Sequence, residues 1–569
     1  MALNLLASLP ICNFPRAALP SRGPIHLKSL VTSRSDIVPG PVQCKVSSKI
    51  SSSTDIVRRS ANYQPPIWGY DYIQSLRSEY LGEEYTGQVN KLKEQVRMML
   101  HKVLDPLEQL ELIDTLQRLG LSYHFEGETK RILEGLYNND HGGDSWKKEN
   151  LYATALKFRL FRQHGYKVFN SSMERGSFKA CLCDDTKGML ALYEASFLSI
   201  EGENILEEAR DFSTKHLQEF VKQNKDQNLS TVVSHALELP LHWRILRVEA
   251  RWFIDVYRSK EDMNPTLLKL AELDFNMVQA AHQEDLKQVS RWWRSTGLAE
   301  KLSFVRDRLT ESFFWTVGCT FHPHFGYCRR MSTKVNVLIT VIDDIYDVYG
   351  TLDELELFTD AVERWEINAM DGLPNYMKIC FLALHNSVNE MAFDILKEQE
   401  FHIIRYLKKT WADLCRAYLL EAKWYYSGYT PRLQEYLENA SLDCLEEYPN
   451  IVRLSSMILR LADDLGTSTD ELKRGDVPKS IQCYMNETGA SEEDAREYIR
   501  YLISATWKKM NEERAATSPF SETFIEIAFN LGRMAQCMYQ YGDGHGVGNH
   551  ETKDCLLSLF VQPIPPYKG

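Results

Sequence analysis

The sequence predicts an all-α fold with two helical domains, and three observations lead to this prediction. Apolar residues recur at three- and four-residue spacing, the period of a helix with one buried face. One such stretch contains Leu92, Val96, Met99, Leu100, Val103 and Leu104. The alternation of Val, Ile and Thr that marks a strand is hard to find after Arg58. Pro and Gly gather at a few breaks, such as Asn264-Pro265, which separate the helical stretches.

Length and charge exclude several functional classes. The chain has 569 residues, of which 44% are hydrophobic, and this is ample for more than one buried core. Its net charge of −12 disfavours nucleic acid and anionic membranes as partners. No run of about 18 uncharged apolar residues occurs, so no membrane span is expected.

The first 57 residues differ in composition from the rest. Their acids are Asp36 and Asp55 alone, whereas Ser is dense and the basic residues are Arg16, Arg22, Lys28, Arg34, Lys45 and Lys49. An acid-poor start rich in Ser, Arg and Lys is typical of an organelle transit peptide. We therefore expect residues 1–57 to be a transit peptide and the mature chain to begin at Arg58. A disordered tail is the alternative.

The mature chain divides near its middle. The break at Met263-Asn264-Pro265 interrupts the helical pattern, and we place the domain boundary there. Residues 58–264 form the expected N-terminal helical domain, and residues 265–569 form the C-terminal one. The candidate chemistry lies in the second domain.

Three acids lie close together in an apolar segment, Val341-Ile-Asp343-Asp344-Ile-Tyr-Asp347. At about 3.6 residues per turn, Asp343 and Asp347 lie on one face of a helix with Asp344 beside them. Acids are costly to bury unless something positive compensates, and Mg²⁺ commonly bridges carboxylates and substrate phosphates. This segment is therefore a candidate metal site, and solvated acids at a helix end are the alternative.

A second set of oxygen ligands follows in Asp463-Asp464-Leu-Gly-Thr467-Ser-Thr-Asp-Glu471. Asp463, Thr467 and Glu471 are spaced four residues apart, so they form one stripe on a helix. Two oxygen-ligand stripes on separate helices suggest one shared ligand, and a diphosphate held by several divalent ions fits both. Asn336 lies seven residues before Asp343 and should face the same cavity, where its amide either orients a water or is a satisfied core group.

The two motifs together resemble those of the class I terpene synthases, DDxxD and (N/D)DxxS/TxxxE. Arg306-Asp-Arg308, which precedes Asp343 by 37 residues, resembles the family's RxR motif. Arg58-Arg59, eight residues and Trp68 match the RRx8W motif of plant monoterpene synthases. The resemblance spans the mature chain. It implies an N-terminal α-barrel-like domain and a C-terminal α-bundle that carries the reaction.

The resemblance also implies roles for individual residues. The implied metal ligands, for three Mg²⁺ or Mn²⁺ ions, are Asp343, Asp344, Asp347, Asp463, Thr467 and Glu471. The implied diphosphate-binding cations are Arg306, Arg308, Arg460 and Lys479. Arg58, Arg59 and Trp68 would cover the site.

A carbocation needs a dry, electron-rich wall. Family position makes Trp315 the candidate cation–π surface, and Tyr418 is a second aromatic candidate. The glycine-rich segment after Tyr539 resembles the family's capping loop, so Tyr539 and His545 are candidate bases for the final proton loss. A flexible loop with a surface histidine is the alternative.

The resemblance implies a monoterpene synthase of the plastid stroma, a monomer or weak homodimer, that acts on geranyl diphosphate. The expected course is ionisation, isomerisation to a linalyl intermediate, ring closure and loss of a proton or capture of water. No Asp-x-Asp-Asp string occurs, which argues against protonation-initiated cyclisation. The alternatives are an acyclic product of the ocimene or linalool type, a sesquiterpene synthase, a non-catalytic scaffold and a metal-dependent phosphohydrolase.

Overall fold

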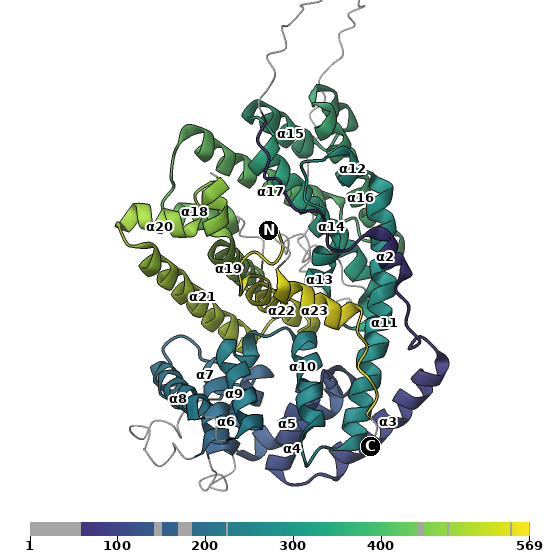
Figure 1. Cartoon of the computed structure of the whole chain (residues 1–569), viewed down its shortest axis with the longest axis vertical. Helices are drawn as coiled ribbons and strands as arrows, with labels where there is room; N and C mark the ends of the chain where they lie inside the picture. The colour runs from purple at the N-terminus through teal and green to yellow at the C-terminus, as the bar shows by residue number, and fades with distance from the viewer. Residues whose placement is uncertain are drawn as a thin grey trace, which may run out of the picture.

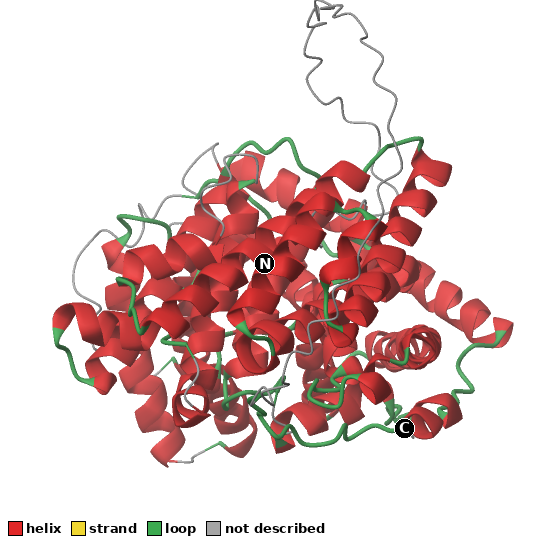
Figure 2. Ribbon diagram, turned by 90° about the horizontal axis from the view of Figure 1, so that it is seen from above, coloured by secondary structure: helices red, strands yellow, loops and turns green. Residues whose placement is uncertain are grey.

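The computed structural model describes residues 58–140, 151–168, 185–223, 226–441, 449–474, 477–546 and 549–567, and within these ranges it consists of helices and connecting loops (Figure 2). The all-α prediction is confirmed. The expected transit peptide, residues 1–57, lies outside the described residues. No described helix is long and apolar enough to cross a membrane.

The helices before residue 264 are α2 (Tyr70–Ser75), α3 (Glu83–Lys102), α4 (Pro106–Arg118), η1 (Ser122–His124), α5 (Glu126–Asp140), α6 (Leu151–Gln163), α7 (Thr186–Ser196), α8 (Asn204–Gln223), α9 (Gln227–Glu238), η3 (Leu241–Trp243) and α10 (Leu246–Arg258).

Those after it are α11 (Pro265–Thr296), α12 (Leu298–Lys301), α13 (Leu309–Cys319), η4 (Pro323–Phe325), α14 (Gly326–Asp344), η5 (Ile345–Tyr349), α15 (Leu352–Arg364), η6 (Ile367–Gly372), α16 (Asn375–Gln399), α17 (Ile404–Ser427), α18 (Leu433–Ser441), α19 (Asn450–Arg474), α20 (Ser480–Thr488), α21 (Glu492–Ala515), α22 (Glu522–Tyr539) and α23 (His550–Phe560).

Helix α11 begins where the sequence predicts a break. The Asn264 side chain accepts hydrogen bonds from the backbone N–H groups of Thr266 and Leu267, and Pro265 occupies the first helical position, where no N–H is needed. The helix ends at Gly297, whose φ of 65° suits a residue without a side chain. Its start is therefore fixed by local sequence.

The helices form two tiers, with α4–α9 in the lower tier of Figure 1 and α13–α22 in the upper one. Helix α11 packs against α2, α3 and α10 and also against α13, α14 and α23. One continuous apolar core contains Trp68 and Val96 from the start of the chain together with Phe313 and Leu338 from the upper tier. The start of the chain therefore packs in the same core as the upper tier, which carries the candidate site.

The segment with the first acidic motif is not a uniform α-helix. Helix α14 ends at Asp344, and Ile345–Tyr349 form one turn of π-helix, closed by the hydrogen bond from the Gly350 N–H to the Ile345 carbonyl at 2.8 Å. Single π turns are rare and occur often at functional sites. The wider turn carries Asp347, which still faces the same cleft as Asp343.

Candidate active site

A deep cleft opens in the upper tier, with a volume of about 1190 Å³ including its mouth. Helices α13, α14, α17, α19 and α22 contribute to its walls, together with the π turn η5 and the loop after α22. The predicted site residues that line it are Arg306, Trp315, Asn336, Asp343, Asp347, Tyr418, Arg460, Asp463, Thr467, Glu471, Lys479, Tyr539 and His545. Residues predicted from motifs over 230 positions apart therefore share one cavity.

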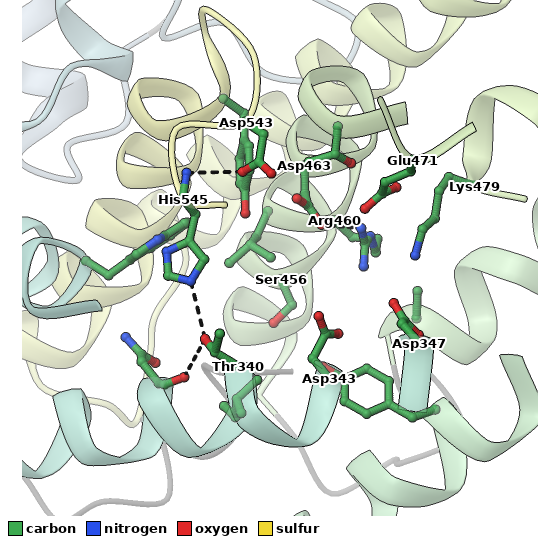
Figure 3. Close-up of a pocket in the computed structure, with 18 of the residues that line it drawn as sticks. Thr340, Asp343, Asp347, Ser456, Arg460, Asp463, Glu471, Lys479, Asp543 and His545 are labelled. Atoms are coloured by element: carbon green, nitrogen blue, oxygen red, sulfur yellow. Dashed lines mark hydrogen bonds and ion pairs between the residues drawn. The ribbon is translucent and has the colours of Figure 1, made fainter. Parts of the chain in front are cut away.

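The two acidic stripes face each other across this cleft. Figure 3 shows Asp343 and Asp347 on one wall and Asp463, Glu471 and Lys479 on the opposite wall. Asp343 forms an ion pair with Arg306, and Asp463 forms one with Arg460. Among the described residues, no three His, Cys, Asp or Glu side chains gather around a single point. The stripes are therefore separate half-sites with a space between them.

The donor atoms of the second stripe fit a metal ion. Thr467 Oγ1 and Glu471 Oε2 are buried, and neither has a hydrogen-bond partner among the described residues. Buried oxygens without partners are energetically costly, and a hard divalent cation is the ligand that such oxygens suit. Burial, with further contributions from Glu471 and Asp464, raises the pKa of Asp463 to about 7. A cation bound at this stripe would stabilise the ionised form of the Asp463 carboxylate.

Asp344, expected to bind metal, does not line the cleft. Its side chain is fully buried, and Oδ2 accepts a hydrogen bond from the Arg306 backbone N–H at 2.8 Å. Its Oδ1 lies 2.9 Å from Arg306 Nε, an ionic contact that is not aligned as a hydrogen bond. Because helix positions one residue apart point about 100° apart, Asp343 faces the cleft while Asp344 faces the interior.

Asp464 repeats this arrangement on α19. Its fully buried carboxylate accepts from Arg460 Nε at 2.8 Å, from the Tyr436 hydroxyl at 3.0 Å and from the Ser480 N–H at 3.1 Å. In each motif, then, the first aspartate faces the cleft and the second fixes an arginine that lines it. Sequence reasoning missed this division because Arg306, Tyr436 and Ser480 come from other segments, although Arg460 lies only four residues before Asp464 on the same helix.

Arg308, expected to bind diphosphate, also lies outside the cleft. Its buried guanidinium donates to the Gln64 carbonyl at 3.1 Å and to the Gly546 carbonyl at 2.9 Å. It therefore joins the segment before α2 to the loop after α22. Arg306, Arg460 and Lys479 are the predicted cations that do line the cleft.

The expected cap, Arg58 and Arg59, contacts residues of the upper tier. Arg58 forms two hydrogen bonds of 2.8 Å with the Glu354 carboxylate and one of 3.0 Å with the Tyr349 carbonyl. The Arg59 guanidinium stacks on the Tyr425 ring, 4.6 Å from its centre. Trp68 is buried at a separate cavity beside α11 and α13 rather than at the cleft.

Aromatic side chains also line the cleft. The Trp315 and Tyr539 rings lie 6.1 Å apart. His545 Nε2 lies 3.3 Å from the Thr340 hydroxyl, and the Asp543 carboxylate accepts a hydrogen bond from the His545 backbone N–H at 3.1 Å (Figure 3). Burial, assisted by Arg306 and Arg308, lowers the pKa of His545 to about 3, so its imidazole is neutral. Asn336 Oδ1 is buried without a hydrogen-bond partner among the described residues.

Several lining residues were not expected from the sequence. These are chiefly Glu421, Asp543, Ser456 and Thr340. Glu421 follows Tyr418 by three residues and Thr340 precedes Asp343 by three, so helical spacing from a candidate residue was the available signal.

The chain matches two family models, "Terpene synthase, N-terminal domain" over residues 67–237 and "Terpene synthase family, metal binding domain" over residues 294–444 and 441–509. It is 71% identical to a chloroplastic myrcene synthase of Quercus ilex, with 99% of each chain covered.

The chain belongs to the terpene synthase family. The crystal structure of limonene synthase with 2-fluorolinalyl diphosphate is 47% identical, with a TM-score of 0.86 over 90% of this chain and 100% of that one. The structure of grey poplar isoprene synthase with three Mg²⁺ ions and dimethylallyl-S-thiolodiphosphate is 46% identical, with a TM-score of 0.80 over 88% and 100%.

These matches confirm several predictions. This terpene synthase is an enzyme of the carbon–oxygen lyase type and depends on a divalent metal. The expectation of a plastid protein agrees with the chloroplastic relative.

Proposed function

We propose that this terpene synthase converts geranyl diphosphate to a monoterpene and diphosphate. The observation that carries the proposal is the cleft itself, in which two oxygen-ligand stripes and three cations meet an aromatic pocket. Such a cavity suits a substrate with an anionic head and an apolar tail. The similarity to a myrcene synthase and a limonene synthase supports a ten-carbon substrate.

The metal ligands in this proposal are Asp343, Asp347, Asp463, Thr467 and Glu471. Mg²⁺ is the proposed ion, with Mn²⁺ as a substitute, and the three-ion complex of isoprene synthase supports the number. Bound ions would supply the charge stabilisation that a departing diphosphate needs. Asp344 leaves the expected ligand set, because its buried carboxylate already holds Arg306.

Arg306, Arg460 and Lys479 bind the diphosphate in this scheme. The donors of the two arginines are fixed before the ligand arrives, since Asp344 holds Arg306, and Asp464 holds Arg460. Preorganised donors aimed at developing charge are the largest electrostatic contribution to many enzymatic rates.

The aromatic residues of the cleft stabilise the carbocation. Trp315 and Tyr418 offer ring faces, and a desolvated cation–π contact is worth about 2 kcal/mol. The neutral imidazole of His545 can take a proton, with Tyr539 as the second candidate base. The buried amide oxygen of Asn336 can hold a water at the pocket wall.

The segment from Arg58 to Trp68 excludes water from the reaction. Its anchors are the Arg58–Glu354 pair at one end and the Arg308–Gln64 contacts at the other. We further propose that the chain divides at residue 264 into a scaffold and a catalytic domain, which the separate family matches on either side support.

The proposed function has two versions, which differ in whether the monoterpene product is cyclic or acyclic. A cyclic product is the expectation from the sequence, and the identity to a myrcene synthase favours an acyclic one. The test uses the protein beginning at Arg58, incubated with Mg²⁺ and with geranyl or farnesyl diphosphate. Its products are identified by gas chromatography–mass spectrometry.

Ten-carbon products from geranyl diphosphate support the proposal, and their ring count settles the class. Fifteen-carbon products alone would indicate a sesquiterpene synthase. The absence of any volatile product would support the alternative of a non-catalytic scaffold.

A further inference from the structure

Glu421 is a buried carboxylate in the cleft to which the proposed function gives no role. It lies on α17, one helical turn after Tyr418, and its side chain is only 4% exposed. Burying an ionised carboxylate costs several kcal/mol unless a cation and hydrogen bonds compensate. The partners of Glu421 therefore indicate why it is there.

Its two carboxylate oxygens contact two different groups. Oε2 lies 3.9 Å from the Lys479 ammonium, and Oε1 accepts a hydrogen bond from Asn439 Nδ2 at 3.3 Å. Asn439 also donates to the Ala417 carbonyl, so the amide is tied to the backbone of α17. The Glu421 carboxylate is thus held in place from the side away from the lysine.

Lys479 has few other constraints. It immediately precedes α20, its side chain is 5% exposed, and Glu421 is the one carboxylate within 4.0 Å of its ammonium in the described part of the chain. A lysine side chain is a flexible stem with a point charge. Its ammonium also feels the charges of Glu471 and Asp347, which the proposed function assigns to metal ions.

We propose that Glu421 is a positioning residue that holds the Lys479 ammonium toward the diphosphate and away from the metal-binding oxygens of Asp347 and Glu471. This rests on the proposed diphosphate-binding role of the cleft. At 3.9 Å the contact is electrostatic and longer than a hydrogen bond, so the N–H donors of Lys479 remain available to the ligand.

A double-mutant cycle with Lys479 tests this proposal. The variants are Glu421→Gln, Glu421→Ala, Lys479→Met and the corresponding doubles, and the matched control is Asn439→Ala, which removes the contact on the other oxygen without changing charge. Two quantities are measured: binding of inorganic diphosphate with Mg²⁺ by calorimetry, and kcat and KM for geranyl diphosphate.

Both single Glu421 variants should weaken diphosphate binding and lower kcat by about 10-fold, and they should add less than about 2-fold once Lys479 is Met. Asn439→Ala should have a smaller effect than either Glu421 variant, because the Glu421 charge beside Lys479 remains. Tighter diphosphate binding in Glu421→Gln would overturn the proposal, because it would mean that Glu421 only repels the ligand. Equal effects of Glu421→Gln with and without Lys479 would also overturn it.

Two features keep the test decisive. If Glu421→Ala does not fold, the nearly isosteric Glu421→Gln still completes the cycle. Diphosphate binding by a wild-type protein that forms no terpene would refute the proposed function while leaving the coupling between Glu421 and Lys479 measurable.

Discussion

Asp343 and Asp344 are adjacent acids, and replacing each by Asn should damage the protein in a different way. Asp344 is fully buried against Arg306, whereas the side chain of Asp343 is 28% exposed at the cleft wall. Removing one partner of a buried ion pair costs about 3–5 kcal/mol, and an exposed pair is worth about 0–1 kcal/mol. Asp344→Asn should therefore be the destabilising change.

The magnitude for Asp344→Asn lies near the lower limit. Asparagine still offers one oxygen to the Arg306 N–H, which Asp344 now accepts at 2.8 Å, and Asp343 still pairs with the guanidinium, which loses only its buried partner. We expect a loss of about 3 kcal/mol. For a cooperative unit of about 300 residues, the unfolding entropy is about 0.6 kcal/mol/K, so the melting midpoint should fall by about 5 °C.

The assay combines two measurements. Far-UV circular dichroism follows the loss of helix on heating, and product analysis follows turnover. Asp343→Asn should lose turnover while its helical signal and midpoint stay near those of the wild type. Asp344→Asn should melt early and keep measurable Mg²⁺-dependent diphosphate binding at low temperature. The reasoning is refuted if Asp344→Asn melts within about 1 °C of the wild type, or if Asp343→Asn keeps full activity.

Four further predictions follow from the same structure. Arg58→Met removes charge-assisted bonds to Glu354 worth about 1.5–3 kcal/mol, so hydrogen exchange of residues 60–69 should quicken about 10-fold or more, with Arg58→Lys intermediate. Gly466→Ala places a Cβ 3.0 Å from Tyr539 Cβ and 3.1 Å from the Gly542 carbonyl, so it should displace the loop after α22 and lower kcat; unchanged kcat and melting would contradict this. A chelator should abolish turnover. Mg²⁺ with diphosphate should raise the melting midpoint, because ligand at 100 times its dissociation constant adds about 2.7 kcal/mol to the free energy of unfolding. Because the pKa of His545 is about 3, its imidazole loses its proton well below neutral pH, so His545→Gln should leave the shape of the kcat profile between about pH 6 and 8 unchanged.

The three spaced residues of the second motif share one helix stripe that the sequence predicts, because a helix fixes their spacing. Asp463, Thr467 and Glu471 recur every four positions, and on the regular helix α19 they all line the cleft as predicted. The start of α11 was equally local, since Asn264 and Pro265 form its cap and first position. Such features depend on neighbours in sequence and need no knowledge of the rest of the fold.

Tertiary structure alone decided which acids face the cleft and which face the interior. Asp344 is held by Arg306, and Asp464 by Tyr436 and the N–H of Ser480, all outside their own motifs. Arg308 likewise binds carbonyls 238 and 244 positions away rather than the cleft. A side chain's role depends on the groups that surround it in space, and helical periodicity cannot supply those groups because distant segments bring them.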